Sequence, residues 1–284
     1  TWAFFDHFVG ADDHWLPPDN IQEYRIATVA HRTSPTNIGL ALLANLSAYD
    51  FGYIVAGSVL KRTANTLKTM DALERHRGHF YNWYDTQTLQ PLPPLYISTV
   101  DSGNLAGHLL TLRAGLLALA DDTILPARLF EGLRDTLRIL LAEADKAVTE
   151  QATAFRDELE SALTAPPDSL AAARARLERL ATSAAELATQ AARRPHGGDI
   201  TAPEGDGKGR DEGWAQALAR QCREGLDELC FLAPWQLLPS VRSEKESFAD
   251  LVGIPTLREL AMAGSTQAGD RMAAIERLAW RCLQ

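Results

Sequence analysis

The sequence predicts an all-α fold, and three features of the 284-residue chain favour this class. Apolar residues recur every three or four positions through most of the chain, which is the spacing that lines one face of a helix. Helix-start residues precede several of these stretches, and prolines and glycines separate them. No convincing pair of strands accompanies them, so we expect roughly eight helices and little strand.

Composition limits the classes of function. The chain is 46% hydrophobic, so it can bury a core as one large domain or two small ones. Its net charge of −9 and its lack of any basic run argue against nucleic acid as a partner. No apolar run approaches the roughly 20 residues that span a bilayer, and the first residues lack the basic start of a secretion signal. We therefore expect a soluble, intracellular segment with no direct membrane insertion.

The first third of the chain contains two predicted helices. Residues 1–35 are expected to be loop with at most a short first helix. Ser34 can cap free amides and Pro35 loses no hydrogen bond at a first helical position, so together they predict a helix over 35–49. Apolar residues at helical spacing predict a second helix over 54–75.

An aromatic segment, HFYNWYD at residues 79–85, follows the second predicted helix. The loop after it, residues 89–95, contains three prolines and cannot be helical, because proline removes an amide and clashes with the preceding turn. Asp101 or Ser102 is then expected to cap a third helix from Gly103 to about residue 120.

A long amphipathic stretch occupies residues 126–194. Its apolar positions continue on both sides of a proline turn at 165–168 with alternating steps of three and four, as in paired helices. This predicts a long antiparallel helical hairpin whose Arg, Glu and Asp residues face solvent as a structural arm. Residues 195–213 combine Gly, Pro and charge and are predicted to be a flexible linker.

Three further helices are predicted over 214–231, 255–263 and 270–281. The expected organisation is the first helices and loops, the arm, the linker and further helices of the first domain, over 1–125, 126–194, 195–213 and 214–284. Three cysteines lie in or beside helical segments without the spacing of a zinc site, so we expect reduced, half-buried thiols at Cys222, Cys230 and Cys282.

Polar and aromatic residues outside the apolar stripes gather in three loop regions, at 15–37, 79–85 and 98–104. Loops held by a rigid scaffold are where binding sites usually form. Rings beside carboxylate, amide and basic groups suit a sugar, whose C–H faces stack on rings while its hydroxyls need polar partners. The candidate binding residues are Trp15, Asp19, Glu23, His31, Arg32, Trp83, Tyr84, Asp85, Asp101 and Asn104.

Each candidate also has a structural interpretation. Trp83 and Tyr84 either form a stacking platform or pack on the core with their polar tips at the surface. Asp101 either binds hydroxyls, as Asp85 and Asn104 are expected to, or serves as a helix cap. His31 with Arg32 either donates to hydroxyls or ties down the start of a helix. The binding interpretation requires the three loop regions to converge.

Other chemistries fit poorly. His76 and His79 form a weak pair without further ligands, so neither a metal nor another cofactor is expected. Ser102 lacks the strand and the glycines of a nucleophile elbow. Transfer of a glycosidic bond normally requires two flanking carboxylates, and the sequence does not set the distances among the candidate ones.

Four motifs resemble the central glucoamylase-like region of bacterial cyclic β-1,2-glucan synthases. They are TWAFFDHFVGADDHWLPPDNIQE, VAHRTSPTNIGL, MDALERHRGHFYNWYDTQTLQPLPP and VDSGNLAGHLL, in the family's order. The resemblance is dense over residues 1–112, thins through the predicted arm and returns at 232–235 and 254–261.

The resemblance implies an (α/α)6 barrel, β-1,2-glucan as ligand and ring closure by transglycosylation. It also implies other domains of the same polypeptide as partners and a place on the cytoplasmic side of the inner membrane. A complete barrel needs more helices than this sequence predicts, so the chain resembles the N-terminal half of that region. The motifs of the family's catalytic carboxylates are absent, so the catalytic residues stay unassigned and the segment is expected to bind sugar without turnover.

An alternative function is a helical scaffold without a sugar site. In this hypothesis the hairpin at 126–192 docks a neighbouring domain or another copy of the chain through apolar faces left uncovered.

Overall fold

The computed structural model describes residues 2–22, 28–143, 146–192, 213–236 and 253–284. The predicted site residue Glu23 and nearly all of the predicted linker lie outside these ranges. Within them the chain is built from helices with a few very short strands, which confirms the all-α class.

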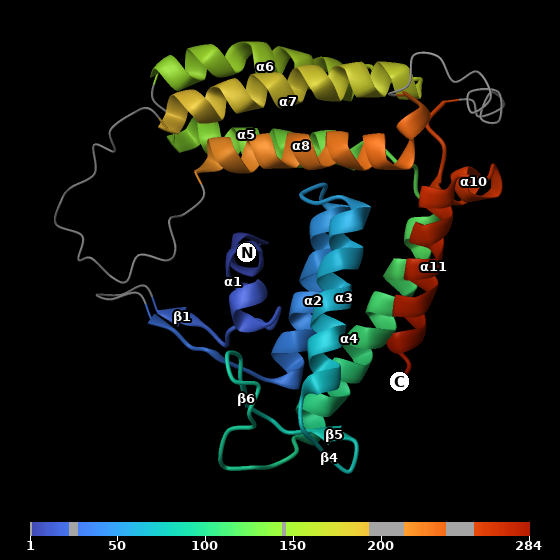
Figure 1. The fold of residues 1–284 in the computed structure, drawn as a ribbon. Coiled ribbons are helices and arrows are strands. Elements are labelled where there is room, and N and C mark those ends of the chain that lie inside the picture. The colour runs from blue at the N-terminus through green and yellow to red at the C-terminus, as the bar shows by residue number, and fades with distance from the viewer. Residues whose placement is uncertain (1, 23–27, 144–145, 193–212, 237–252) are drawn as a thin grey trace.

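The helices form two layers (Figure 1). The upper layer contains α5 (Arg128–Glu143), α6 (Lys146–Thr164), α7 (Leu170–Ala192) and α8 (Trp214–Leu232). The lower layer contains α2 (Pro35–Asp50), α3 (Ala56–Ala72), α4 (Thr99–Ala118) and α11 (Thr266–Arg281), with α1 (Trp2–Phe8) and α10 (Leu257–Met262) beside them. Single 3₁₀ turns form η1 (Ala11–Asp13), η2 (Leu119–Asp121) and η3 (Pro234–Gln236).

Three two-stranded antiparallel pairs tie the loops together. They are β1 (Ile21–Gln22) with β2 (Thr28–Val29), β3 (Arg32–Thr33) with β6 (Tyr84–Asp85), and β4 (Arg75–His76) with β5 (His79–Phe80). Each strand is two residues long, so these pairs fix loop positions and add no layer to the fold.

Two helix starts show how side chains set the ends of the lower layer. The Asn37 amide donates to Ser34 Oγ at 3.2 Å, which confirms the predicted start of α2. The predicted cap of α4 is wrong, because the Asp101 amide donates to Ser98 Oγ at 3.1 Å and the helix begins at Thr99. Ser98 has the better position, since Asp101 then occupies the third helical position, where a carboxylate faces the free amides.

The upper layer contains the predicted hairpin and one further helix. The half of the hairpin before the proline turn forms α5 and α6, and the half after it forms α7. The further helix, α8, packs against both α7 and α5. The side chains at the centre of this layer have no exposed surface: Leu133, Phe155, Leu159, Leu177, Leu180 and Leu218. The apolar seam of α7, on which the docking alternative relied, is therefore buried within the chain. The predicted division into an arm and further helices remains a prediction.

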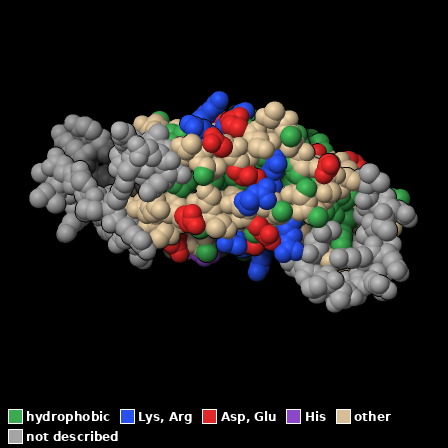
Figure 2. Space-filling view, turned by 90° about the horizontal axis from the view of Figure 1, so that it is seen from above, with side chains coloured by type: hydrophobic (Ala, Val, Ile, Leu, Met, Phe, Trp, Pro, Cys, Tyr) green, Lys and Arg blue, Asp and Glu red, His purple; other side chains and the backbone are tan. Residues whose placement is uncertain are grey.

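The outward surface of the upper layer is polar. Figure 2 shows Lys and Arg interspersed with Asp and Glu on this face, with small apolar areas between them. Several of these groups pair, as in the contacts of Glu158 with Arg176 and Arg179. This distribution is typical of a solvated helix surface.

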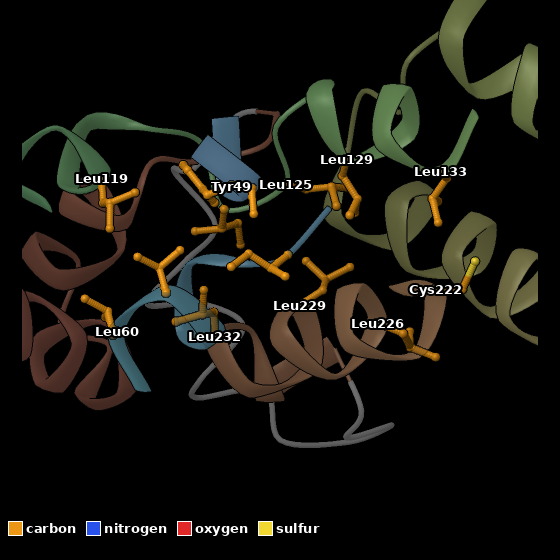
Figure 3. Packing of buried hydrophobic residues seen from close by; sticks show 14 of the residues in the cluster. Tyr49, Leu60, Leu119, Leu125, Leu129, Leu133, Cys222, Leu226, Leu229 and Leu232 are labelled. Atoms are coloured by element: carbon orange, nitrogen blue, oxygen red, sulfur yellow. The ribbon is translucent and has the colours of Figure 1, made fainter. Parts of the chain in front are cut away.

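The two layers meet in an apolar joint (Figure 3). Tyr49 and Leu60 from the lower layer face Leu229 and Leu232 of α8 across this joint. Gly52 lies in the turn between α2 and α3 with a φ of +74°, and a Cβ there would fall 1.8 Å from the Arg128 backbone oxygen. Only glycine allows this turn to reach the start of α5.

Charged contacts also cross the joint. Glu228 of α8 accepts from Arg271 of α11 at 2.7 Å and from the Gly57 amide at the start of α3 at 3.0 Å. Burial raises the pKa of Glu228, and the nearby Arg271 and the Gly57 amide only partly oppose that effect. The buried carboxylate therefore ties one upper helix to two lower ones.

Two further expectations concern the whole chain. The three cysteines are free thiols as predicted, but Cys222 and Cys282 are buried and only Cys230 is half-buried. In the described ranges, no helix combines the length and the apolar character needed to cross a bilayer. The barrel type implied by the resemblance remains a prediction.

Candidate functional site

The N-terminal ends of α2 and α4 meet at the end of the lower layer that faces away from the upper one (Figure 1). Asn104 Nδ2 donates to Thr36 Oγ1 at 3.1 Å, and the Asp101 carboxylate receives hydrogen bonds from the side chains of Ser98, Thr36 and Ser34. Burial raises the pKa of Asp101, but these bonds outweigh it and hold the pKa below its usual value. The two helix starts thus surround an ionised carboxylate, which their free amides and partial positive charge favour.

The pairing of β3 with β6 joins two of the predicted loops. Arg32 lies opposite Asp85 and Thr33 lies opposite Tyr84, and the Thr86 amide donates to the His31 backbone oxygen at 3.0 Å. This register brings the segment before α2 alongside the HFYNWYD segment. The convergence that the binding hypothesis requires therefore holds for these loops.

Arg32 contacts the Trp83 ring and the Asp19 carboxylate. Its guanidinium carbon lies 4.7 Å from the centre of the Trp83 ring, and its Nη2 donates to Asp19 Oδ2 at 2.9 Å. Asn37 Nδ2 also donates to Asp19, at 3.3 Å to Oδ1. Because the guanidinium covers one face of the indole, a sugar ring would stack on the other face or on Arg32 itself.

Asn82 connects Trp83 to Asp101. This amide is 6% exposed, and its hydrogen-bonding partners fix its orientation. In that orientation it donates to Asp101 Oδ2 at 2.8 Å and accepts from Trp83 Nε1 at 2.9 Å and from the Tyr96 hydroxyl at 2.7 Å. Asn82 was not among the predicted site residues, although its place between the rings of HFYNWYD was a signal.

Asp85 uses one carboxylate oxygen to hold its own turn. Oδ1 accepts from the Gln87 amide at 2.9 Å, the Thr88 amide at 2.7 Å and the Thr88 hydroxyl at 3.0 Å. Burial raises the pKa of Asp85. The hydrogen bonds from Thr88 and Gln87, together with nearby His31, lower it by more than burial raises it, so the pKa lies below its usual value. The other oxygen has no hydrogen-bond partner in the described part of the chain.

His31 contacts a carboxylate, Asp13, that was also not among the predicted site residues. Its Nδ1 lies 2.8 Å from Asp13 Oδ1, and the Thr86 hydroxyl donates to the same oxygen at 2.5 Å. Asp13 is 7% exposed, whereas the side chain of His31 is 39% exposed. The pair lies next to the β3–β6 contact and so adjoins Arg32 and Asp85.

Two predicted residues make contacts other than those that join these loops. Tyr84 has no exposed surface, donates its hydroxyl to the Glu74 backbone oxygen at 2.7 Å and has a pKa raised by burial to about 12. It supports the loop from inside, as in the structural interpretation. The contacts of Trp15 are with α3, where Arg62 lies 5.8 Å from its ring centre and Thr66 donates to its backbone oxygen.

Seven predicted residues therefore lie in one group, which we call the Trp83 cluster. Its members are Asp19, His31, Arg32, Trp83, Asp85, Asp101 and Asn104, with Asp13 and Asn82 as supports. The cluster offers an aromatic ring, ionised carboxylates and amide and guanidinium donors. A separate pocket lies between the layers, where Tyr49, Leu129 and Leu232 help to line it.

Comparison with known proteins gives a relative that matches part of the chain. No family model matches the chain. Over 110 residues it is 50% identical to the cyclic β-(1,2)-glucan synthase NdvB of Rhizobium meliloti strain 1021. This match covers 39% of the present chain and 4% of that much longer protein. Identity of this degree shows that 110 residues of the chain are similar to a segment of that synthase.

Proposed function

We propose that this chain is the part of a cyclic β-1,2-glucan synthase that binds β-1,2-glucan, and that the Trp83 cluster is its binding surface. One observation carries the proposal. Loops that the sequence marked separately as sugar-binding candidates join at one end of the helices, in a chain half identical over 110 residues to a glucan synthase.

The chemistry of the cluster suits a glucose polymer. In this proposal the indole face of Trp83 opposite Arg32 takes the C–H face of a sugar ring, and Arg32 and Asn104 donate to hydroxyl oxygens. The carboxylates of Asp85 and Asp101 accept from hydroxyl groups. Their lowered pKa values keep them ionised at neutral pH, which suits acceptors.

The same pKa values argue against a general-acid role for these two carboxylates. A general acid for glycosidic transfer needs a raised pKa so that it keeps its proton near neutral pH. Asp85 and Asp101 have lowered ones. In this proposal the chain holds glucan for chain transfer and ring closure by transglycosylation on the cytoplasmic side of the inner membrane. The catalytic carboxylates come from the other half of the same glucoamylase-like region.

Titration of the purified chain with linear β-1,2-glucooligosaccharides, followed by tryptophan fluorescence, tests the proposal. We expect saturable binding, with β-1,3-linked oligosaccharides binding far more weakly. Trp83→Ala should weaken binding by about 1–3 kcal/mol, the value of an aromatic contact surface. Trp280→Ala is the matched control, because Trp280 lies on α11 and is 63% exposed.

The titration has two outcomes that would overturn the proposal. One is a folded wild-type chain that does not bind β-1,2-glucan. The other is a folded Trp83→Ala chain that binds as tightly as the wild type, which would remove the ring from the binding surface.

A further inference from the structure

Asp13 is a buried carboxylate, and one of its oxygens contacts both Thr86 and His31. It lies at the end of η1, and its Oδ1 receives the Thr86 hydroxyl and faces His31 Nδ1, 73 and 18 residues away in sequence. Burying a carboxylate is costly unless hydrogen bonds compensate for the lost water. The contacts to the residue before β3 and to the residue after β6 compensate for that loss.

The contact fixes which ring nitrogen of His31 carries hydrogen. A carboxylate oxygen only accepts hydrogen bonds, and here it already accepts from Thr86, so the hydrogen between the two groups belongs to His31 Nδ1. In the neutral ring the other nitrogen, Nε2, then carries a lone pair and no hydrogen. Nε2 has no hydrogen-bond partner among the described residues, and the side chain is 39% exposed.

We infer that Asp13 is a positioning residue that presents His31 Nε2 as a hydrogen-bond acceptor for a ligand hydroxyl at the Trp83 cluster. This inference rests on the proposed function for the identity of the ligand. It reverses the donor role that the sequence suggested for His31, because Asp13 already takes up the Nδ1 hydrogen. Arg32 supplies a donor beside it, so neighbouring hydroxyl groups of one sugar can meet an acceptor and a donor.

If the Asp13 contact served only to hold η1 against the segment before β3, Asp13 would also lie next to His31. The first measurement therefore determines which nitrogen of the His31 ring carries hydrogen. Nitrogen-15 NMR of the ligand-free chain, at a pH where the ring is neutral, reports which nitrogen is protonated. We expect hydrogen on Nδ1 in the wild type and a shift toward hydrogen on Nε2 in Asp13→Ala. Asp12→Ala is the control, because the neighbouring Asp12 is exposed and should leave the ring unchanged.

The second measurement uses glucan affinity and leaves Asp13 intact. In His31→Gln the amide oxygen can stand where Nε2 stands, whereas the shorter side chain of His31→Asn replaces only the Nδ1 end. We expect His31→Asn to weaken β-1,2-glucan binding about 10-fold, the usual worth of one hydrogen bond, and His31→Gln to restore most of that loss. Asp13→Ala alone should weaken glucan binding relative to the wild type. Added to His31→Asn, the same change should weaken glucan binding little further.

The outcomes separate this inference from the proposed function. Hydrogen on Nε2 in the ligand-free wild type, or equal affinities for His31→Gln and His31→Asn, would overturn the role of Asp13 even if glucan binds through Trp83. A chain that binds no β-1,2-glucan would overturn the proposed function, and with it the ligand assigned to Nε2.

Discussion

The upper layer and the Trp83 cluster form by different rules. In the upper layer the side chains that meet are apolar, and their spacing along each helix already predicts that they share a face. In the cluster the side chains are polar or aromatic, and side-chain hydrogen bonds join segments as far apart as Thr36 and Asn104. The difference shows that periodicity predicts packing, whereas a binding surface depends on how loops pair at helix ends.

The largest expected effect separates stability from binding. Phe155 has no exposed surface, so Phe155→Ala should lower the free energy of unfolding by about 3–5 kcal/mol through lost burial and a cavity. Glucan affinity should not change at temperatures where the variant is folded. Denaturant unfolding and the glucan titration check both parts. Phe51→Ala is the control, since Phe51 is 62% exposed, and an equal loss there would contradict the comparison.

The second largest loss of stability is expected at the ion pair of Glu228 with Arg271, which connects the two layers. Arg271 and Glu228 have side chains that are 20% and 9% exposed, so Arg271→Met should cost about 3 kcal/mol by leaving the carboxylate unpaired. Adding Glu228→Gln should recover part of that loss, because the unpaired charge is then gone. Unfolding free energies of the four proteins in this cycle measure the coupling, and strictly additive losses would show that the pair does not act as a unit.

Two serine caps give a smaller and sharper comparison. Ser98 caps α4 beside the Trp83 cluster, and Ser265 caps α11, where its Oγ accepts from the Ala268 amide at 3.3 Å. Each change to alanine should cost about 1 kcal/mol of stability. Only Ser98→Ala should also weaken glucan binding, because Ser98 hydrogen-bonds to Asp101. Equal loss of affinity in both variants would show that binding follows overall stability.

The smallest expected effect is a pH dependence of opposite sign at Asp101 and Glu228. Burial raises the pKa of Asp101 and its hydroxyl partners lower it more, so its folded pKa lies below the ordinary 3.8. Its contribution to stability is present above that value and is lost as pH falls through the folded pKa. Burial raises the pKa of Glu228 above 4.5, so the native state holds that proton more tightly and stability falls as pH rises through the raised pKa.

Unfolding free energies measured between about pH 3 and 7 check these signs. The advantage of the wild type over Asp101→Asn should shrink toward low pH. The advantage over Glu228→Gln should shrink as pH rises from about 4.5. The same slope for both differences would contradict the distinct surroundings of these carboxylates.

Most of the fold was predictable because its signals are local. Ser34 and Pro35 predicted the start of α2 within one turn, and apolar spacing predicted α3, α7 and α8. The start of α4 was misplaced because Ser98 and Asp101 are both good capping residues, and only the hydrogen bond from the Asp101 amide distinguishes them. The packing of α8 against α7 and α5 was not predictable, since its apolar stripe does not specify a partner.

The candidate site was predictable in its residue types and less so in its members. The sequence marked Trp83 and Asp101 but not Asn82, which hydrogen-bonds to both of them. It marked Tyr84, whose ring the fold buries completely. Nothing near Asp13 in the sequence marked it as a site residue. It belongs to the site through its contacts with His31 and Thr86, which lie beside it only after β3 and β6 pair.

The sequence by itself determined the helical class, the main helices and the residue types available for a polar, aromatic surface. Helix formation and apolar periodicity act over a few residues, so they can be read along the chain. Only the tertiary structure decided which side chains face outward, which carboxylates stay ionised and which nitrogen of His31 is left to accept a hydrogen bond. Those properties depend on burial and on contacts between distant segments, and the chain acquires both only when its loops meet at the ends of α2 and α4.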